Sequence, residues 1–364
     1  MQRILIGINS LAEALKGSIK VLLVCDSSFP FLSIKNDIER IEVPYITFDQ
    51  FTSNPLYEDV CKGVDLFQSA QCDTILAVGG GSSLDVAKCI KLYCQMDKDK
   101  LYLEQEYKDT GVKLVAIPTT AGTGSESTRY AVIYFDGKKQ SVTHDSIIPD
   151  VAILESRVLK TLPDYQKKCT MMDALCQGIE SWWSLNSTGK SKDYSKKTVE
   201  LIMSNWRKYI LDNDDEAAAQ IMLAANYSGR AINITQTTAP HAMSYKLTSL
   251  YGLPHGHAVA ICLPEVWTYM ITHTKLCIDQ RGMQYLYGVF ADIAQTLGFS
   301  SLVDAIEFIR FQLKEMKLDN PKTSCREKDI EILTNSVNPI RLKNNPIPID
   351  KDTLRQLYQT IITD

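Results

Sequence analysis

Four short runs of β-branched and aliphatic residues recur in the first third of the chain, and amphipathic segments separate them. Strands that alternate with helical segments are typical of a parallel sheet with helices on its faces. Beyond about residue 160 such runs largely disappear, and apolar residues recur at the helical period. We therefore predict an α/β domain over residues 1–160 and an all-helical domain over residues 161–364. The runs are KVLLVC at 20–25, VPYITF at 43–48, DTILAV at 73–78 and KLVAIP at 113–118.

A helix is expected between the second and the third run. Asn54 is its expected N-cap, and Pro55 fits the first turn. Val60, Val64 and Phe67 then fall on one face at helical spacing. This segment therefore has the pattern of a helix that crosses over between two parallel strands.

The bulk properties exclude several classes of protein. The length of 364 residues favours two domains, because a single core stops growing beyond roughly 250–300 residues. The net charge of −4 gives no broad positive field for a phosphate backbone, so we expect no nucleic-acid partner. No stretch is apolar enough to span a bilayer, and we expect no membrane partner. The N-terminus lacks the apolar core and cleavage site of a signal peptide, which predicts a cytoplasmic protein.

Three consecutive glycines, Gly79, Gly80 and Gly81, end the third run in the segment VGGGSSLDVAK. A helix is expected to begin directly afterwards, at Ser82 or Ser83. Glycines let the backbone approach a diphosphate, and the N–H groups at a helix start bind the anion. The spacing differs from the common G-x-G-x-x-G, so a tight turn between strand and helix is the alternative interpretation. On the nucleotide interpretation, the contacts of this segment extend to Asp85.

A second glycine-bearing loop, IPTTAGTGSEST, follows the fourth run. It offers the hydroxyl groups of Thr119, Thr120, Thr123 and Ser125. Two such loops at the ends of adjacent strands favour a nucleotide site over a pair of simple turns. Lys139, further along the chain, is a further candidate for the same site.

Asp26 closes the first run in the segment VLLVCD. A carboxylate at this position could accept hydrogen bonds from an adenosine ribose and would repel a 2′-phosphate. Asp26 therefore favours NAD over NADP as the cofactor. The alternative is that Asp26 caps a helix or a turn, a common role for Asp at such places.

A carboxylate, an amide and two imidazoles form the third group of candidates, in the helical half. Asp173 and Gln177 are one turn apart on an expected helix and point the same way. His241 and His255 follow, the latter in the turn LPHGHAVA. Such side chains suit Fe²⁺ or Zn²⁺ with one position left open for a substrate. Spacing of this kind also occurs by chance, and ordinary helix and turn residues are the alternative.

Together these motifs resemble the iron-containing, or group III, alcohol dehydrogenase family over most of the chain. The resemblance implies a Rossmann-like α/β domain followed by an all-α domain, the dehydroquinate synthase-like architecture. It also implies NAD(P) and a divalent metal, with a small-molecule aldehyde or alcohol as substrate. The similar segments are GGGSSLDVAK, PTTAGTGSE, PDVAIL, MDAL and LPHGHAVAICLP.

Carried over by position, the resemblance implies that Asp173, His241 and His255 ligate the metal. The chain departs from the family at Gln177, where a His is usual and a weaker, neutral donor stands instead. It departs again at Tyr245, where the family often has a His near the nicotinamide. Metal binding through Gln177 and the usual proton relay are therefore open questions.

Further similarity over MMDALCQGIESWWSLNST and SYKLTSLYGLPHGHAVAICLPEVW points to the phosphonoacetaldehyde reductase branch. That branch would imply reduction of phosphonoacetaldehyde to 2-hydroxyethylphosphonate. A dianionic substrate needs cationic or polar partners. For each candidate the alternative is an ordinary surface or packing role. The candidates are Arg129, Lys246, His257 and the polar groups of Asn186, Ser187 and Thr188.

The expected reaction is hydride transfer from the nicotinamide to an aldehyde whose oxygen the metal polarises. Tyr245, His257 or a water chain could supply the proton, and the sequence does not decide among them. A dehydrogenase of short-chain alcohols or polyols is the alternative within enzymes. A nucleotide-binding regulatory protein that has lost catalysis is the alternative from another class. The sequence leaves the oligomeric state open, with a homodimer as one assembly to consider.

Overall fold

The computed structural model describes residues 2–364, which form two compact units. Within the described residues, unit 1 consists of residues 2–162 and 213–229, and unit 2 of residues 163–212 and 230–364. The chain therefore leaves unit 1 after residue 162 and returns to it for one short stretch. That stretch includes most of helix α7 (Asp215–Thr235), which crosses from unit 1 into unit 2 after residue 229.

Unit 1 is built on a parallel sheet, which confirms the predicted α/β class. Its strands lie in the order β1-β8-β5-β4-β2-β3, and every neighbouring pair is parallel. The four predicted runs form β2 to β5, and the segment PDVAIL contains β8. The strands are β1 (Arg3–Ile6), β2 (Val21–Cys25), β3 (Tyr45–Phe48), β4 (Thr74–Gly79), β5 (Lys113–Pro118) and β8 (Val151–Leu154).

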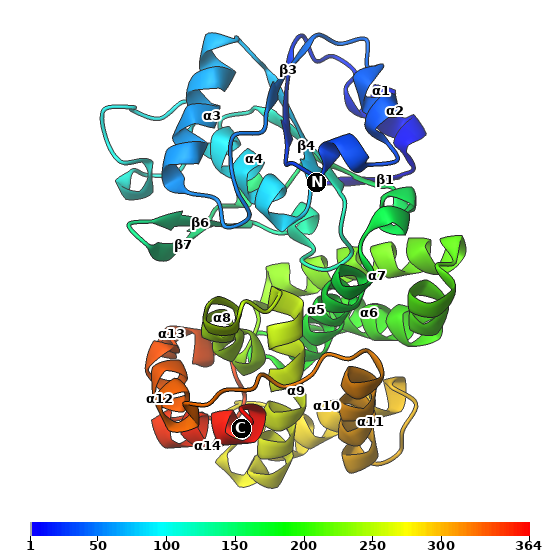
Figure 1. Cartoon of the computed structure of the whole chain (residues 1–364), viewed down its shortest axis with the longest axis vertical. Helices are drawn as coiled ribbons and strands as arrows, with labels where there is room; N and C mark the ends of the chain where they lie inside the picture. The colour runs from blue at the N-terminus through cyan, green and yellow to red at the C-terminus, as the bar shows by residue number, and fades with distance from the viewer. Residues whose placement is uncertain (1) are drawn as a thin grey trace. The chain divides into compact units, whose positions relative to one another are not determined.

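Helices α3 (Tyr57–Ser69) and α4 (Gly81–Tyr93) pack against each other, and α4 also packs against β4 and β5 (Figure 1). Val60, Val64 and Phe67 of α3 are buried, as their spacing predicts. α4 begins at Gly81, one residue before the earlier of its two predicted starts. The shorter helices of this unit are α1 (Leu11–Ala14) and α2 (Lys35–Glu39).

The predicted N-cap of α3 is wrong. Leu56 is the N-cap, and Asn54 instead adopts a left-handed backbone with φ 82°. The Pro55 carbonyl accepts a hydrogen bond of 2.8 Å from the Tyr134 N–H, which holds this stretch outside the helix. Asn tolerates positive φ better than most residues, so the same side chain that suits a cap also suits this turn.

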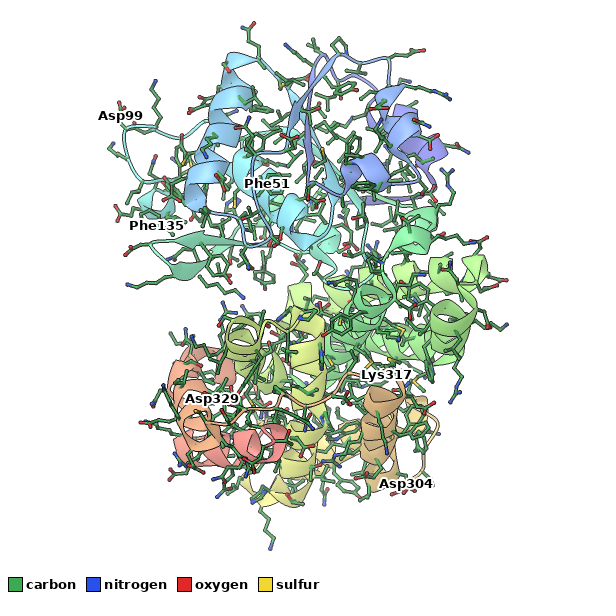
Figure 2. The ribbon with its side chains drawn as sticks, in the orientation of Figure 1. Phe51, Asp99, Phe135, Asp304, Lys317 and Asp329 are labelled. Carbon is green, nitrogen blue, oxygen red and sulfur yellow. The ribbon has the colours of Figure 1, made fainter. Side chains whose placement is uncertain are left out.

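A β-hairpin outside the main sheet covers part of α3 and α4. It consists of β6 (Tyr130–Phe135) and β7 (Lys138–Thr143), which pair antiparallel. Phe135, labelled in Figure 2, meets the Tyr57 ring edge-on with ring centres 5.0 Å apart. This aromatic contact ties the end of β6 to the first turn of α3.

Unit 2 is helical, which confirms the prediction that helices replace strands after about residue 160. α5 lies against α6 and α9, and α8 lies against α9. The Tyr251 hydroxyl at the end of α8 donates a 2.8 Å hydrogen bond to Asp329 of α12, labelled in Figure 2. The helices are α5 (Asp164–Trp183), α6 (Gly189–Arg207), α8 (Ala239–Tyr251), α9 (His255–Thr272), α10 (Met283–Thr296), α11 (Leu302–Glu315), α12 (Arg326–Ser336), α13 (Pro339–Leu342) and α14 (Lys351–Ile361).

No helix within residues 2–364 combines the length and the hydropathy that crossing a membrane requires.

Candidate active site

Two glycine-bearing loops meet at the carboxyl edge of the unit 1 sheet, where neighbouring strands β4 and β5 end. A Cβ atom built on Gly80 would lie 3.6 Å from Thr120 Cγ2. A Cβ atom built on Gly81 would lie 3.1 Å from Thr123 Cγ2. The loops predicted to hold a nucleotide are therefore packed side by side.

Gly79 shows why this turn requires glycine. Its φ of 157° is rare for residues with a side chain, and a Cβ atom here would overlap Ser83 Oγ and lie 3.0 Å from Asp26 Oδ2. Gly80, the N-cap of α4, offers no side chain to the first N–H groups of the helix. The start of α4 thus presents N–H groups and the positive end of the helix dipole, which suits a phosphate.

Asp26 lies at the end of β2, next to this turn. Its Oδ1 accepts hydrogen bonds from the Ser28 N–H at 2.9 Å and the Ser28 hydroxyl at 2.5 Å. Its Oδ2 accepts a hydrogen bond from the Ser83 hydroxyl at 2.7 Å. Asp26 therefore has the contacts of a turn-capping carboxylate and also stands beside the first glycine loop, so contact with a ribose stays a prediction.

A buried network holds the second loop in place. Asp85 accepts hydrogen bonds from the Ser125 hydroxyl at 2.8 Å and from the Val132 N–H at 2.9 Å. The Lys88 ammonium donates to the hydroxyls of Ser125 at 2.8 Å and Thr128 at 3.1 Å. Burial opposes the charge and lowers the pKa of Lys88 to about 8. Asp85 and Ser125 thus hold the second loop in place through hydrogen bonds. The sequence did not suggest this role.

The other predicted nucleotide contacts lie on the same elements. Ser82 is the second residue of α4, and the Thr119 N–H donates a 3.0 Å hydrogen bond to the last residue of β4. The Thr123 hydroxyl accepts an N–H from within its own loop at 3.2 Å. Lys139 lies on β7, and its charge opposes the rise in the pKa of Asp85 that burial causes.

Three side chains able to bind a metal converge in unit 2. Asp173 lies in the middle of α5, His241 near the start of α8, and His255 is the first residue of α9. One potential ligand atom from each residue lies within 4.8 Å of the other two. The structure therefore brings together the three predicted ligands that carry a carboxylate or an imidazole.

Two donor atoms in this cluster are buried without a hydrogen bond. Asp173 Oδ1 and His241 Nε2 are 3.3 Å apart, and neither accepts or donates a hydrogen bond within residues 2–364. Each residue is only 3% exposed. Buried polar atoms without a partner are rare and costly. A divalent cation between these atoms would satisfy both, so the residues present fit a metal.

Gln177, the fourth predicted ligand, lies one turn after Asp173 on α5 and is equally buried. Burial raises the pKa of Asp173, but His241, His255 and a hydrogen bond from Gln177 outweigh it and hold that pKa below its usual range. Gln177 therefore supports the charged form of Asp173 from within the cluster. Its amide oxygen is a weaker metal donor than an imidazole nitrogen.

Glu180 completes the cluster, and the sequence interpretation missed it. This carboxylate is fully buried and accepts hydrogen bonds from His241 Nδ1, the Thr238 N–H at 2.7 Å and the Thr238 hydroxyl at 2.9 Å. Burial lowers the pKa of His241, but Glu180 and Asp173 outweigh it and raise that pKa to about 9. Asp173, Gln177 and Glu180 share one face of α5 at spacings of four and three residues. That polar stripe in a buried helix was the available signal.

Gly256 allows α9 to reach the cluster. A Cβ atom at this position would overlap the Cys169 carbonyl oxygen and lie 2.9 Å from Asp173 Cβ. Only glycine fits between the two helices, because the atoms it meets belong to the backbone and Cβ of α5. Its neighbour His255 therefore lies next to Asp173.

Two models of one family together cover most of the chain. Residues 2–156 match the model described as iron-containing alcohol dehydrogenase, and residues 168–362 match the C-terminal model of the Fe-containing alcohol dehydrogenase family. The chain belongs to the iron-containing alcohol dehydrogenase family. It is therefore an oxidoreductase of the alcohol dehydrogenase and aldehyde reductase type, which confirms the predicted enzyme class.

Similar proteins support this assignment. Phosphonoacetaldehyde reductase from Streptomyces viridochromogenes is 31% identical over 304 residues, which are 80% of this chain and 76% of that protein. Sulfoacetaldehyde reductase from Bifidobacterium kashiwanohense, solved in complex with NAD+, is 25% identical with a TM-score of 0.83, covering 99% of this chain and 96% of that one. An iron-containing alcohol dehydrogenase from Thermococcus thioreducens shares the fold, with a TM-score of 0.87 at 23% identity over 99% of this chain and 98% of that one.

Tyr245, at the position where the resemblance implies a His, lies against the cluster. Its ring stacks on the His255 ring with centres 5.7 Å apart and planes 3° from parallel. The Tyr245 hydroxyl accepts a 3.1 Å hydrogen bond from Arg341 Nη1. The structure therefore places this proton-donor candidate beside a candidate ligand.

His257, the other proton-donor candidate, is engaged by the protein on both ring nitrogens. Nε2 lies 2.9 Å from the Asp319 carbonyl oxygen and Nδ1 lies 2.7 Å from the Tyr165 hydroxyl. A carbonyl only accepts, so Nε2 carries the proton and Nδ1 accepts from Tyr165. Burial lowers the pKa of His257 and keeps the ring neutral. These contacts give His257 a structural role.

Of the six substrate candidates, Asn186 and Lys246 lie in unit 2 and Arg129 in unit 1, and substrate binding by these residues stays a prediction. Asn186 follows the end of α5, more than two turns beyond Asp173, and its amide donates a 3.5 Å hydrogen bond to the Thr235 carbonyl. Lys246 is half-buried on α8 and projects about 100° around the helix from Tyr245. Arg129 belongs to unit 1 and pairs with Asp145 at 3.2 Å.

Proposed function

We propose that this chain is an NAD(P)H-dependent, metal-assisted reductase that converts phosphonoacetaldehyde to 2-hydroxyethylphosphonate. The observation that carries the proposal is the buried cluster of Asp173, His241 and His255, in which two donor atoms have no hydrogen-bond partner. Membership of the iron-containing alcohol dehydrogenase family supports aldehyde reduction as the reaction. The relative from S. viridochromogenes supports the phosphonate.

The substrate names of two similar proteins share one chemistry. Phosphonoacetaldehyde and sulfoacetaldehyde are both short aldehydes that carry a tetrahedral oxyanion close to the carbonyl carbon. A site for either substrate needs a centre that polarises the carbonyl and a cation beside it. This common requirement supports an anionic aldehyde as the substrate class.

The nucleotide is assigned to unit 1. The N–H groups at the start of α4 and the hydroxyls of the second loop would bind the diphosphate. Asp26 would accept hydrogen bonds from the adenosine ribose and repel a 2′-phosphate, so we propose NADH as the preferred donor. The complex of the sulfoacetaldehyde reductase with NAD+ supports this choice.

Asp173, His241 and His255 would hold Fe²⁺ or Zn²⁺, with the amide oxygen of Gln177 as a fourth donor. When bound, the metal supplies a Lewis acid for the aldehyde oxygen, and the nicotinamide supplies the hydride. Glu180 accepts the His241 Nδ1–H and so keeps Nε2 directed toward Asp173. These contacts orient the donors of the cluster.

The proton for the product oxygen is assigned to the Tyr245 hydroxyl or to water that it positions. The Tyr245 oxygen accepts from Arg341, so its own hydrogen is directed to another acceptor. His257 is the weaker candidate, because its Nε2–H is committed to the Asp319 carbonyl. Tyr245→Phe is expected to slow reduction while leaving metal content unchanged.

The decisive experiment is NADH oxidation with phosphonoacetaldehyde, sulfoacetaldehyde and propanal, using protein stripped by a chelator and then restored with Fe²⁺ or Zn²⁺. Metal-dependent turnover that favours an anionic aldehyde supports the proposal. Equal or better turnover of propanal leaves a dehydrogenase of general short-chain alcohols. Turnover that survives stripping contradicts the metal. Binding of NADH without any turnover favours a regulatory protein.

A further inference from the structure

Arg341 is a cation next to the metal cluster that the sequence interpretation did not single out. It lies in the short helix α13, which packs against α8 in unit 2 (Figure 1). Arg341 Nη1 donates a hydrogen bond of 3.1 Å to the Tyr245 hydroxyl. The guanidinium carbon stands 5.0 Å from the centre of the Tyr245 ring.

Two ring contacts connect Arg341 to the cluster. Tyr245 stacks on His255 with ring centres 5.7 Å apart, and His255 in turn meets the His241 ring at 5.4 Å. The distance from the guanidinium carbon to the His255 ring centre is therefore at most the sum of two distances, 5.0 Å to the Tyr245 ring and 5.7 Å between the stacked rings. That separation is within the reach of a small substrate whose carbonyl lies at the cluster.

The charge of Arg341 is not neutralised by the protein. Among residues 2–364, no carboxylate forms an ion pair with its guanidinium, and Tyr245 is its hydrogen-bond acceptor. The side chain is only half-exposed, so solvent compensates its charge incompletely. By contrast, Arg281 and Arg310 of the same unit each pair with a carboxylate, at 2.7 Å and 3.0 Å. A partly buried guanidinium without a carboxylate has N–H donors left for an anionic ligand.

We propose that Arg341 binds the oxyanion group of the substrate, the phosphonate or sulfonate of a short aldehyde, and thereby sets substrate specificity. This inference rests on the proposed aldehyde reduction at the neighbouring cluster. The planar guanidinium can donate parallel hydrogen bonds to two oxygens of such a group. Tyr245 holds the guanidinium in place through its hydroxyl and its ring, and so links recognition of the anion to the position of the carbonyl.

The test compares Arg341→Ala, Arg341→Gln and Arg341→Lys with the natural chain on charged and neutral aldehydes. For Arg341→Ala we expect kcat/KM for phosphonoacetaldehyde or sulfoacetaldehyde to fall roughly 10- to 100-fold, mainly through KM. Turnover of propanal should fall by a clearly smaller factor, because propanal loses only the support that Arg341 gives to Tyr245 and has no group for Arg341 to bind. Arg341→Lys should recover part of the loss, since it keeps the charge but loses the fork of donors. Whichever anionic aldehyde loses more identifies the natural oxyanion.

A binding measurement separates this inference from the proposed function. Titration calorimetry with 2-hydroxyethylphosphonate and with isethionate should show binding to the natural chain that Arg341→Ala weakens by the same factor. Arg207→Ala is the matched control, because Arg207 is an exposed cation over the Trp206 ring in the same unit. It should change neither binding nor kinetics.

Three outcomes decide the matter. In the first, the anions bind and their binding depends on Arg341, but the chain reduces no aldehyde. This result would support the anion site and contradict the proposed function. Turnover of propanal together with no anion binding would keep aldehyde reduction and overturn the role of Arg341. Equal losses for charged and neutral aldehydes in Arg341→Ala, at unchanged metal content and thermal midpoint, would also overturn it.

Discussion

The His241 imidazole is held between two carboxylates, and this arrangement fixes how it can meet a metal. Glu180 contacts Nδ1, which leaves Nε2 directed toward Asp173. We expect Glu180→Gln to weaken metal binding by roughly 10- to 100-fold, the effect typical of losing such a support. Chelator competition would measure it. Glu307→Gln, on an exposed ion pair with Arg310, is the control. Unchanged affinity in Glu180→Gln would show that Glu180 does not orient the ligand.

Gln177 stands at the position where the resemblance implies a fourth metal ligand, usually a His. Its place on α5, one turn from Asp173 and fully enclosed, would suit an imidazole. We expect Gln177→His to raise metal affinity on the order of tenfold, or about 1.4 kcal/mol, because an imidazole is the better donor. Metal content after dialysis against a graded chelator series would report it. A fall in metal content would mean that the amide serves Asp173 rather than the metal.

Helix α9 must approach α5 closely for His255 to join the cluster, and Gly256 allows this. We expect Gly256→Ala to lower the free energy of unfolding by about 1–3 kcal/mol, the cost of overpacking, and to abolish tight metal binding. Gly288→Ala is the matched control, since a Cβ atom there meets nothing within 4 Å inside α10. That variant should be stable or slightly more stable. Thermal unfolding with metal analysis distinguishes the two, and normal metal content in Gly256→Ala would contradict the argument.

The helices and strands were largely predictable, because the spacing of apolar residues in the sequence follows the period of each strand or crossover helix. The runs at 20–25 and 113–118 form β2 and β5, and the glycines Gly79 to Gly81 turn between β4 and α4 as expected. The start of α3 was not predictable, because Asn54 suits a left-handed turn as well as a helix cap.

The candidate site was predictable only in part. Asp173, His241 and His255 meet as the resemblance implied, but their spacing alone could not show it. Glu180 and Arg341 were missed, since each acts through a contact with a residue far along the chain. Long-range contacts leave no local period, and only a polar residue on a buried helix face hints at them.

At the scale of the whole molecule, a single domain boundary does not describe how the chain divides into its two units. Residues 213–229 return to unit 1, where Asn226 of α7 donates hydrogen bonds to Glu126 at 3.0 Å and Ser127 at 2.7 Å. Gly229 passes so close to Gly124 that a Cβ atom on either would overlap the other. A helical pattern in the sequence cannot reveal that one part of α7 packs on a loop of the first unit. The boundary near residue 160 thus stays a prediction.

The two units carry different candidate ligand sites, and the last prediction depends on this division. The candidate metal donors come from α5, α8 and α9 of unit 2, whereas the glycine loops belong to unit 1. Metal at a hundredfold excess over its Kd should stabilise the folded state by about 2.7 kcal/mol. Hydrogen exchange should then slow in these three helices, and NADH should instead slow exchange after β4 and β5. Asp173→Ala should lose the metal effect and keep that of NADH. Slowing by metal in unit 1 alone would contradict the assigned cluster, because a cation bound by three helices must restrict the opening of those helices first.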